Sequence, residues 1–263
     1  MADDTLLDGQ SLLEFQAMSP DEADEDEAAA GPDRRAARLE AAAAARMAGL
    51  RVVLEDLADF GNRAAILRST EALGLLHVHE VAARLPDGGR RAGDTARGRS
   101  IVNGAEKWLQ LHRHEAPGEC VEELHSQGFA VLAAVPPLRA EAAVAAGRQP
   151  LPLEQVDFGA PTALAFGNEA RGVSRELLAA CDGVFTVPML GLTESLNVSV
   201  AAAVCCHFGR HLRAQALGLA PGRGDLSPEE VEVLAASYTR RGAEHGFTAA
   251  VRCGRSRRLR EGG

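Results

Sequence analysis

Three short segments of the sequence place polar side chains next to apolar runs. They are DFGNRAAILR (59–68), FGNE (166–169) and TESLN (193–197). Amide, hydroxyl, carboxylate and guanidinium groups held together can orient a ligand and assist a proton transfer. The residues of interest are Asn62, Arg68, Glu169, Ser195 and Asn197.

Each of these residues also has an ordinary structural interpretation. Asn62 and Ser195 are typical helix caps, Glu169 could be a solvated acid of a turn, and Arg68 a surface residue of a helix. A functional interpretation therefore requires that the three segments meet. The carboxyl ends of parallel strands share one edge of a sheet, where ligands bind.

Common nucleotide and hydrolase motifs are absent from the sequence. The segment GNEARG (167–172) has the glycine spacing of a phosphate-binding loop, but Val173 occupies the position of the required lysine. No G-x-G-x-x-G follows the first predicted strand, and no G-x-S-x-G surrounds Ser195. These absences argue against a P-loop nucleotidase, an ordinary Rossmann dehydrogenase and a serine hydrolase.

The histidines and cysteines do not form a metal-binding motif. His207 and His211 lie four residues apart on a predicted helix, and His112 and His114 lie two apart on a possible strand. Neither pair has a carboxylate or thiol at a recognisable spacing, so we predict no metal. The five cysteines include no C-x-x-C pair, which favours reduced, structural thiols.

Charge is distributed unevenly along the 263 residues. Residues 1–33 contain eleven acids and no Lys or Arg, so the remainder has a formal charge of +2 although the whole chain has −9. Only 4% of residues are aromatic, which leaves few side chains for base stacking, so nucleic acid would be bound through its phosphates. The candidate RNA-binding residues are Arg34, Arg35, Arg38, Arg46, Arg90, Arg91, Arg97 and Arg99.

Apolar periodicity predicts alternating strands and helices. We expect strands at 50–57, 75–82, 129–135, 162–167 and 184–189, and helices at 64–74, 119–127, 173–181, 196–217 and 227–241. This order is typical of an α/β fold with a mostly parallel sheet covered by helices on both faces. The expected organisation is an acidic disordered tail (1–33), a basic helix (34–49), a central domain (50–217) and a C-terminal helix with an arginine-rich tail (218–263).

No run of about eighteen apolar residues occurs, and the acidic start lacks the basic region of a signal peptide. We therefore expect a cytoplasmic protein without a membrane partner.

In their order and spacing, the three polar segments resemble the signature motifs of the SpoU branch of the SPOUT RNA methyltransferases. The resemblance runs from about Arg51 to about Arg213. PMLGLTESLNVSVAAAV (188–204) and GRSIVNGAEKWLQLHRHE (98–115) look most like the TrmH-type enzymes that methylate guanosine-18 of tRNA. The family implies a C-terminal deep trefoil knot, a homodimer, and an S-adenosyl-L-methionine pocket completed by the neighbouring subunit.

The resemblance also implies roles for individual residues. Arg68 matches the arginine that activates or orients the ribose 2'-hydroxyl, and Asn62 the asparagine that positions it. Glu169, Ser195 and Asn197 match the residues that build the rest of the site. Cofactor binding, mostly through the backbone, would involve Ala134, Gly167, Asn168, Glu169, Val187, Met189 and Leu196. Two positions depart from the commonest family pattern: Gly61, directly before Asn62, and Ala134.

The short N-terminal region favours a tRNA substrate over ribosomal RNA, because too little chain precedes Arg51 for a separate RNA-binding domain. Two alternatives remain. The enzyme could methylate the 2'-oxygen of another tRNA or rRNA nucleotide, or the chain could be a catalytically silent RNA-binding knot protein.

Overall fold

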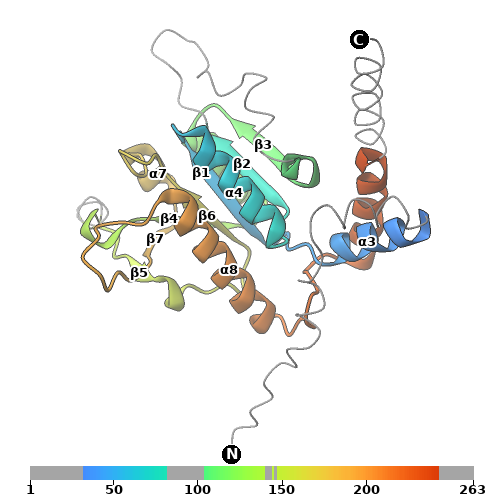
Figure 1. Cartoon of the computed structure of the whole chain (residues 1–263). Coiled ribbons are helices and arrows are strands. Elements are labelled where there is room, and N and C mark those ends of the chain that lie inside the picture. The colour runs from blue at the N-terminus through green and yellow to red at the C-terminus, as the bar shows by residue number, and fades with distance from the viewer. Residues whose placement is uncertain (1–31, 82–103, 140–143, 145–146, 243–263) are drawn as a thin grey trace, which may run out of the picture.

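The protein folds around one seven-stranded parallel sheet (Figure 1). The computed structural model describes residues 32–81, 104–139, 144 and 147–242. The strands are β1 (Leu50–Glu55), β2 (His77–Val81), β3 (Gln110–His114), β4 (Ala130–Ala134), β5 (Leu151–Pro152), β6 (Thr162–Phe166) and β7 (Gly183–Thr186). Their order across the sheet is β3-β2-β1-β6-β4-β7-β5, and every pair is parallel. The predicted α/β class with a mostly parallel sheet is confirmed.

Helices cover both faces of the sheet. The α-helices are α3 (Pro32–Ala44), α4 (Phe60–Ala72), α5 (Pro117–Ser126), α7 (Arg175–Ala180) and α8 (Val198–Ala216). Short 3₁₀ turns occur at η4 (Ala105–Trp108), η5 (Pro137–Arg139) and η6 (Leu153–Gln155). Helices α4 and α8 lie side by side on one face, whereas α5 and α7 contact each other on the other (Figure 1).

The central strands are apolar on both faces because both faces are covered. In β1, Val52 and Leu54 pack under α4 and α8, whereas Val53 between them packs on the side of α5 and α7. In β6, Leu164 and Ala165 divide between the same two cores. This burial explains why Val52–Leu54 of β1 and Ala163–Phe166 of β6 are continuous apolar runs rather than alternating ones.

Several element boundaries differ from the predicted ones, and the capping residues explain the differences. Helix α4 begins four residues earlier than predicted because Asp59, not Asn62, is its N-cap and accepts a hydrogen bond from the Asn62 backbone. Helix α8 is likewise capped by Asn197 rather than Ser195. Strand β5 was missed because two residues show no periodicity.

A further helix occupies 228–242 and packs against α3. Its predicted capping box is confirmed: Ser227 and Glu230 exchange hydrogen bonds between side chain and backbone at 2.8 and 3.2 Å. Tyr238 on this helix is buried and donates a hydrogen bond to the backbone oxygen of Trp108 at 2.9 Å. The described helices include none that is both long enough and apolar enough to cross a bilayer.

Candidate active site

A tight turn at the end of β6 presents the first functional group. The backbones of Asn168 and Gly172 exchange two hydrogen bonds, at 3.0 and 2.7 Å. A Cβ on Gly167 would lie 2.3 Å from the carbonyl carbon of Gly172, so only glycine fits. The buried Asn168 side chain accepts from the backbone of Ala170 and donates to the Asp56 oxygen at 2.7 Å. The turn is thus fixed from within and displays Glu169.

Glu169 connects this turn to the beginning of α4. Its carboxylate accepts hydrogen bonds from the backbone of Ala58 (3.0 Å) and of Asp59 (3.1 Å), and from Nδ2 of Asn62 (3.0 Å). A negative charge at a helix N-terminus is also favoured by the helix dipole. Two segments more than a hundred residues apart therefore meet, as the sequence predicted.

The third segment joins through Asn197. Its Nδ2 donates to Oδ1 of Asn62 at 3.0 Å, while its Oδ1 accepts from the backbone and the hydroxyl of Ser199. The donors run in one direction, from Ser199 through Asn197 and Asn62 to the Glu169 carboxylate. Each amide nitrogen has a second hydrogen that no described residue of this chain accepts. We call this set the Glu169 network.

The network keeps Glu169 ionised. Partial burial raises the pKa of this carboxyl, but the hydrogen bonds from Ala58, Asn62 and Asp59 outweigh burial, and the pKa falls below its ordinary value. Glu169 is therefore an acceptor and anchor at neutral pH, not an acid that donates a proton.

The loop 187–196, between β7 and α8, contrasts with the turn. It contains three residues of the predicted set, Val187, Met189 and Leu196, together with Ser195. Within the part of the chain that the structure describes, this loop makes no hydrogen bond. Leu190 and Leu192 are 100% and 104% exposed. Its peptide groups are free to bind a ligand.

Arg68 does not join the Glu169 network. It lies on the exposed surface of α4, six residues after Asn62, which places it about 9 Å along the helix and on another side. Among the described residues it has no partner. One chain by itself does not bring Arg68 and Asn62 to the same point.

The basic helix corrects one prediction. Arg46 lies beyond the end of α3 and is only 3% exposed. It donates to the backbone oxygen of Glu71 at 2.9 Å and pairs with the Glu71 carboxylate at 2.6 Å. It is therefore a structural residue and not a surface contact for RNA phosphates. Arg35 and Arg38 are exposed, Arg34 lies on α3, and Arg90, Arg91, Arg97 and Arg99 lie outside the described residues.

Sequence reasoning missed the residues that support the turn. Asp56 has a left-handed backbone (φ +50°) and its side chain pairs with Arg171. Glu55 accepts hydrogen bonds from the backbone and the hydroxyl of Ser174, which caps α7. The run from Glu55 to Asp59 contained three acids directly after a buried strand, a signal that could have marked them.

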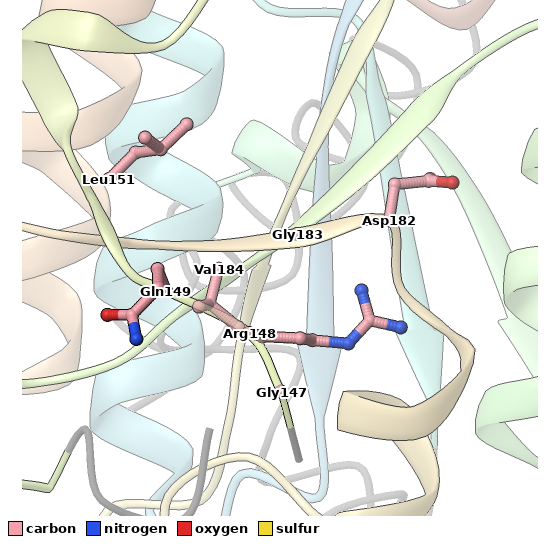
Figure 2. Close-up of a pocket in the computed structure, with 7 residues that line it drawn as sticks. All are labelled: Gly147, Arg148, Gln149, Leu151, Asp182, Gly183 and Val184. Atoms are coloured by element: carbon pink, nitrogen blue, oxygen red, sulfur yellow. The ribbon is translucent and has the colours of Figure 1, made fainter. Parts of the chain in front are cut away.

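A cavity of about 530 Å³ lies elsewhere, at the start of β7 and beside β5 (Figure 2). It is lined by Gly147, Arg148, Gln149, Leu151, Asp182, Gly183 and Val184. The strand starts are the opposite edge of a parallel sheet from the Glu169 network. None of the predicted site residues lines this cavity.

The three polar segments fall within a region that matches a known protein family. The model of the SpoU rRNA methylase family matches residues 49–207, which is more than half of the chain and includes all three segments. The chain belongs to the SpoU methylase family. Methyltransferases of this family use S-adenosyl-L-methionine (AdoMet) as methyl donor.

Curated relatives of this SpoU methylase include two tRNA (guanosine(18)-2'-O)-methyltransferases. The one from Thermus thermophilus is 36% identical over 80% of this chain and 97% of its own length. The one from Escherichia coli K12 is 31% identical over 74% of this chain and 77% of its own.

Two solved structures have a fold similar to that of this chain. The TrmH/SpoU tRNA modifying enzyme of A. aeolicus superposes with a TM-score of 0.62 at 25% identity, over 78% of this chain and 95% of that one. The methyltransferase AviRb of Streptomyces viridochromogenes, solved with AdoMet, has a TM-score of 0.51 at 22% identity, covering 63% and 60%. At 22% identity, the similarity to AviRb shows the fold alone.

The residues at the carboxyl edge fit AdoMet. The loop 187–196 offers peptide groups that are not hydrogen-bonded within the described chain, next to exposed apolar side chains. Oγ1 of Thr186, at the end of β7, is buried and has no partner among the described residues. A nucleoside with polar edges and an apolar ring face can use both kinds of group.

Proposed function

We propose that this SpoU methylase transfers a methyl group from AdoMet to the ribose 2'-oxygen of guanosine-18 in tRNA. The single observation on which the proposal rests is the Glu169 network, in which Asn62, Glu169 and Asn197 are joined at one edge of the sheet. The names of the relatives from T. thermophilus and E. coli support the choice of tRNA and of guanosine-18.

In this proposal AdoMet supplies the electrophilic methyl group. The backbone of the loop 187–196, with Gly167, Asn168 and Ala134, holds the donor, and Asn62 and Asn197 use their remaining N–H groups to orient the ribose. Glu169 fixes both amides, directly or through Asn62. Ser195, exposed at the entrance to α8, lines the same site. Holding the two reactants in line accounts for much of such a rate enhancement.

We propose that Arg68 acts in the site of the second subunit of a homodimer. Its exposure and its separation from Asn62 support this placement. So does the row of exposed apolar residues on the loop and on α8: Leu190, Leu192, Leu196, Val200 and Val204. A guanidinium stays protonated at neutral pH and has no acceptor, so it cannot take up the proton of the hydroxyl by itself. Arg68 instead orients the hydroxyl, or a neighbouring phosphate that receives the proton.

Three further features complete the proposal. The C-terminal part of a central domain at 50–217 forms the trefoil knot of the family. The acidic tail (1–33), the basic helix (34–49) and the C-terminal region (218–263) flank this domain. Arg34, Arg35 and Arg38, with Arg90, Arg91, Arg97 and Arg99, contact the phosphates of tRNA. The enzyme acts in the cytoplasm.

The test is methylation of unmodified tRNA transcripts by the purified chain with AdoMet, followed by mass spectrometry of nuclease fragments. We expect one methyl group on the ribose of guanosine-18, and none on a transcript with 2'-deoxyguanosine at that position. An Asn62→Ala variant serves as the inactive control.

Other outcomes separate the alternatives. Methylation of a different nucleotide would retain the activity and contradict the choice of guanosine-18. AdoMet binding and tRNA binding without methylation of any transcript or of total RNA from a deletion strain would identify a silent RNA-binding protein.

A further inference from the structure

A second polar cluster lies on the face of the sheet that α5 covers. Alternate residues of a strand point to the same face, so His77 and His79 of β2 share a face with His112 and His114 of β3. The register places His79 beside His112 and His114 beside Val81. Since Val81 packs with Cys120 of α5, the four imidazoles lie on the α5 side, away from Asn62 and α4.

The ring nitrogens in this cluster are close together. Nδ1 of His79 and Nε2 of His114 are hydrogen-bonded at 3.0 Å, as are Nδ1 of His77 and Nε2 of His112. The rings of His79 and His112 stack with centroids 4.3 Å apart. His79, His114 and Cys120 are all buried and each offers a ligand atom within 4.8 Å of the others.

One buried nitrogen of the cluster has no hydrogen-bond partner in the described part of the chain. This atom is Nε2 of His79, a residue that is 0% exposed, so water cannot supply the missing hydrogen bond from the surface. Buried polar atoms are normally satisfied, so such an orphan needs an explanation. A metal ion held by this nitrogen would supply the missing partner.

The charges around the cluster can balance a divalent ion. The Glu123 carboxylate lies 3.8 Å from Nδ1 of both His112 and His114. The nearby cation, Arg51, is held by Oε1 of Gln127 at 2.7 Å and stacks on the ring of Phe129 at 3.9 Å. A thiolate and a carboxylate together would neutralise a +2 ion and leave Arg51 in its present contacts.

We propose that His79, His114 and Cys120 bind a zinc ion, with Glu123 as the fourth ligand. Two imidazoles, a thiolate and a carboxylate are ligands that zinc accepts in a tetrahedral site. On binding, the Cys120 sulfur–hydrogen bond is replaced by a sulfur–zinc bond and the proton is released to solvent. The ion fastens the edge strand β3 and helix α5 to β2. Glu123, 40% exposed, lies on the path by which the ion enters.

This site depends on contacts that the sequence pattern did not reveal. The prediction of no metal rested on the absence of a thiol or carboxylate at a recognisable spacing from His112 and His114. In the fold, Cys120 and Glu123 of α5 and His79 of β2 are adjacent to that pair.

The test uses the full chain, purified under reducing conditions, stripped of metal and titrated with Co²⁺ and then with Zn²⁺. We expect one equivalent of either ion per chain. The Co²⁺ form should show a thiolate-to-metal charge-transfer band and the intense visible bands of tetrahedral coordination. Cys120→Ser should lose the charge-transfer band and weaken Zn²⁺ binding at least about 100-fold, because changes outside the ligands already cost 10–100-fold.

Two further variants control for folding. Cys181→Ser removes another buried thiol of the same hydrophobic core and should leave stoichiometry and spectrum unchanged. Glu123→Gln alters a partly exposed side chain, should fold normally, and should weaken Zn²⁺ binding about tenfold with the charge-transfer band retained. The proposal is overturned if the wild-type chain takes up no stoichiometric metal, if its Co²⁺ form lacks a thiolate band, or if Cys120→Ser and Cys181→Ser bind Zn²⁺ equally.

Discussion

The turn at 167–172 and the loop 187–196 lie at the same edge of the sheet but differ in how they are held. The turn is closed by its own backbone hydrogen bonds, by the buried Asn168 side chain and by the bonds of Glu169 to the start of α4. The loop makes no hydrogen bond within the described chain and exposes two leucines completely. In the proposed function, the turn is therefore ordered before binding. The loop keeps peptide groups and apolar side chains available to AdoMet or to a second subunit.

The largest expected effect concerns a residue that belongs to neither region. Arg68→Ala should lower methyl transfer about 10²–10⁴-fold, the usual range for a group assisting proton transfer, while AdoMet binding persists. Arg223→Ala, another exposed arginine, is the control. Calorimetry with AdoMet and single-turnover assays measure the two quantities, and lost AdoMet binding in Arg68→Ala would show that its role is misassigned.

Mixed dimers sharpen the same prediction. If Arg68 serves the other subunit, then mixing inactive Arg68→Ala and Asn62→Ala chains should restore activity, because one site of each mixed dimer then has both residues. If the two residues act within one chain, every mixed site is defective and activity stays absent.

Gly167→Ala tests the packing of the turn at 167–172. Its Cβ would meet the backbone of Gly172, which has no flexible end to move, so we expect a loss of about 1–3 kcal/mol in the free energy of unfolding. Gly118→Ala in α5, where a Cβ meets nothing within 4 Å, should be neutral or stabilising. Urea denaturation compares them, and equal midpoints would contradict the packing argument.

Glu169→Gln removes the charge of the network and retains its shape. We expect a loss of about 1 kcal/mol at pH 7, because charged hydrogen bonds are worth more than neutral ones but this group is only partly buried. The lowered pKa of Glu169 means that its contribution is present above the ordinary carboxyl pKa and is lost as pH falls through the folded-state pKa. The difference between wild type and variant should therefore shrink on acidification, as denaturation at several pH values will show.

Changes in the free loop should spare the fold. Replacing Leu190 and Leu192 by serine removes side chains that are fully exposed in the described part of the chain, so monomer stability should change by less than about 0.5 kcal/mol. The dimer should dissociate more readily, which sedimentation over a range of concentrations measures. Unchanged dimerisation would remove these leucines from the proposed interface.

The smallest effect is expected at the opposite edge. Arg148→Ala in the cavity of Figure 2 should leave methyl transfer unchanged and stability within about 0.5 kcal/mol, although Arg148 donates to the Ala179 oxygen. A large loss of activity would show that cavity size locates the site better than the polar network does.

Local pattern was a good guide where one strand or helix decides its own structure. The apolar runs of β1 and β6 and the capping box at Ser227 were predictable because they depend on neighbours in the sequence. Arg46 could not be placed in this way. Its charge predicted a position on the protein surface. In the fold it is buried between the Glu71 carboxylate and the Tyr238 ring, which are both distant in sequence.

The candidate site likewise has features that the sequence predicted and features that only the fold decided. The residue types of Asn62, Glu169 and Asn197, and their positions at the ends of predicted elements, were enough to indicate a possible site. The direction of their hydrogen bonds, the N-cap role of Asp59 and the isolation of Arg68 depend on how the chain folds and could not be predicted.

The sequence by itself determined the parallel α/β fold, the three polar segments and their family. Only the tertiary structure decided which polar groups meet: Asn62 with Glu169, Arg46 with Glu71, and His79 with His114 and Cys120. The physical reason is range. Periodicity and capping act over a few residues, whereas hydrogen bonds, ion pairs and metal ligation join groups that chain folding brings together from far apart.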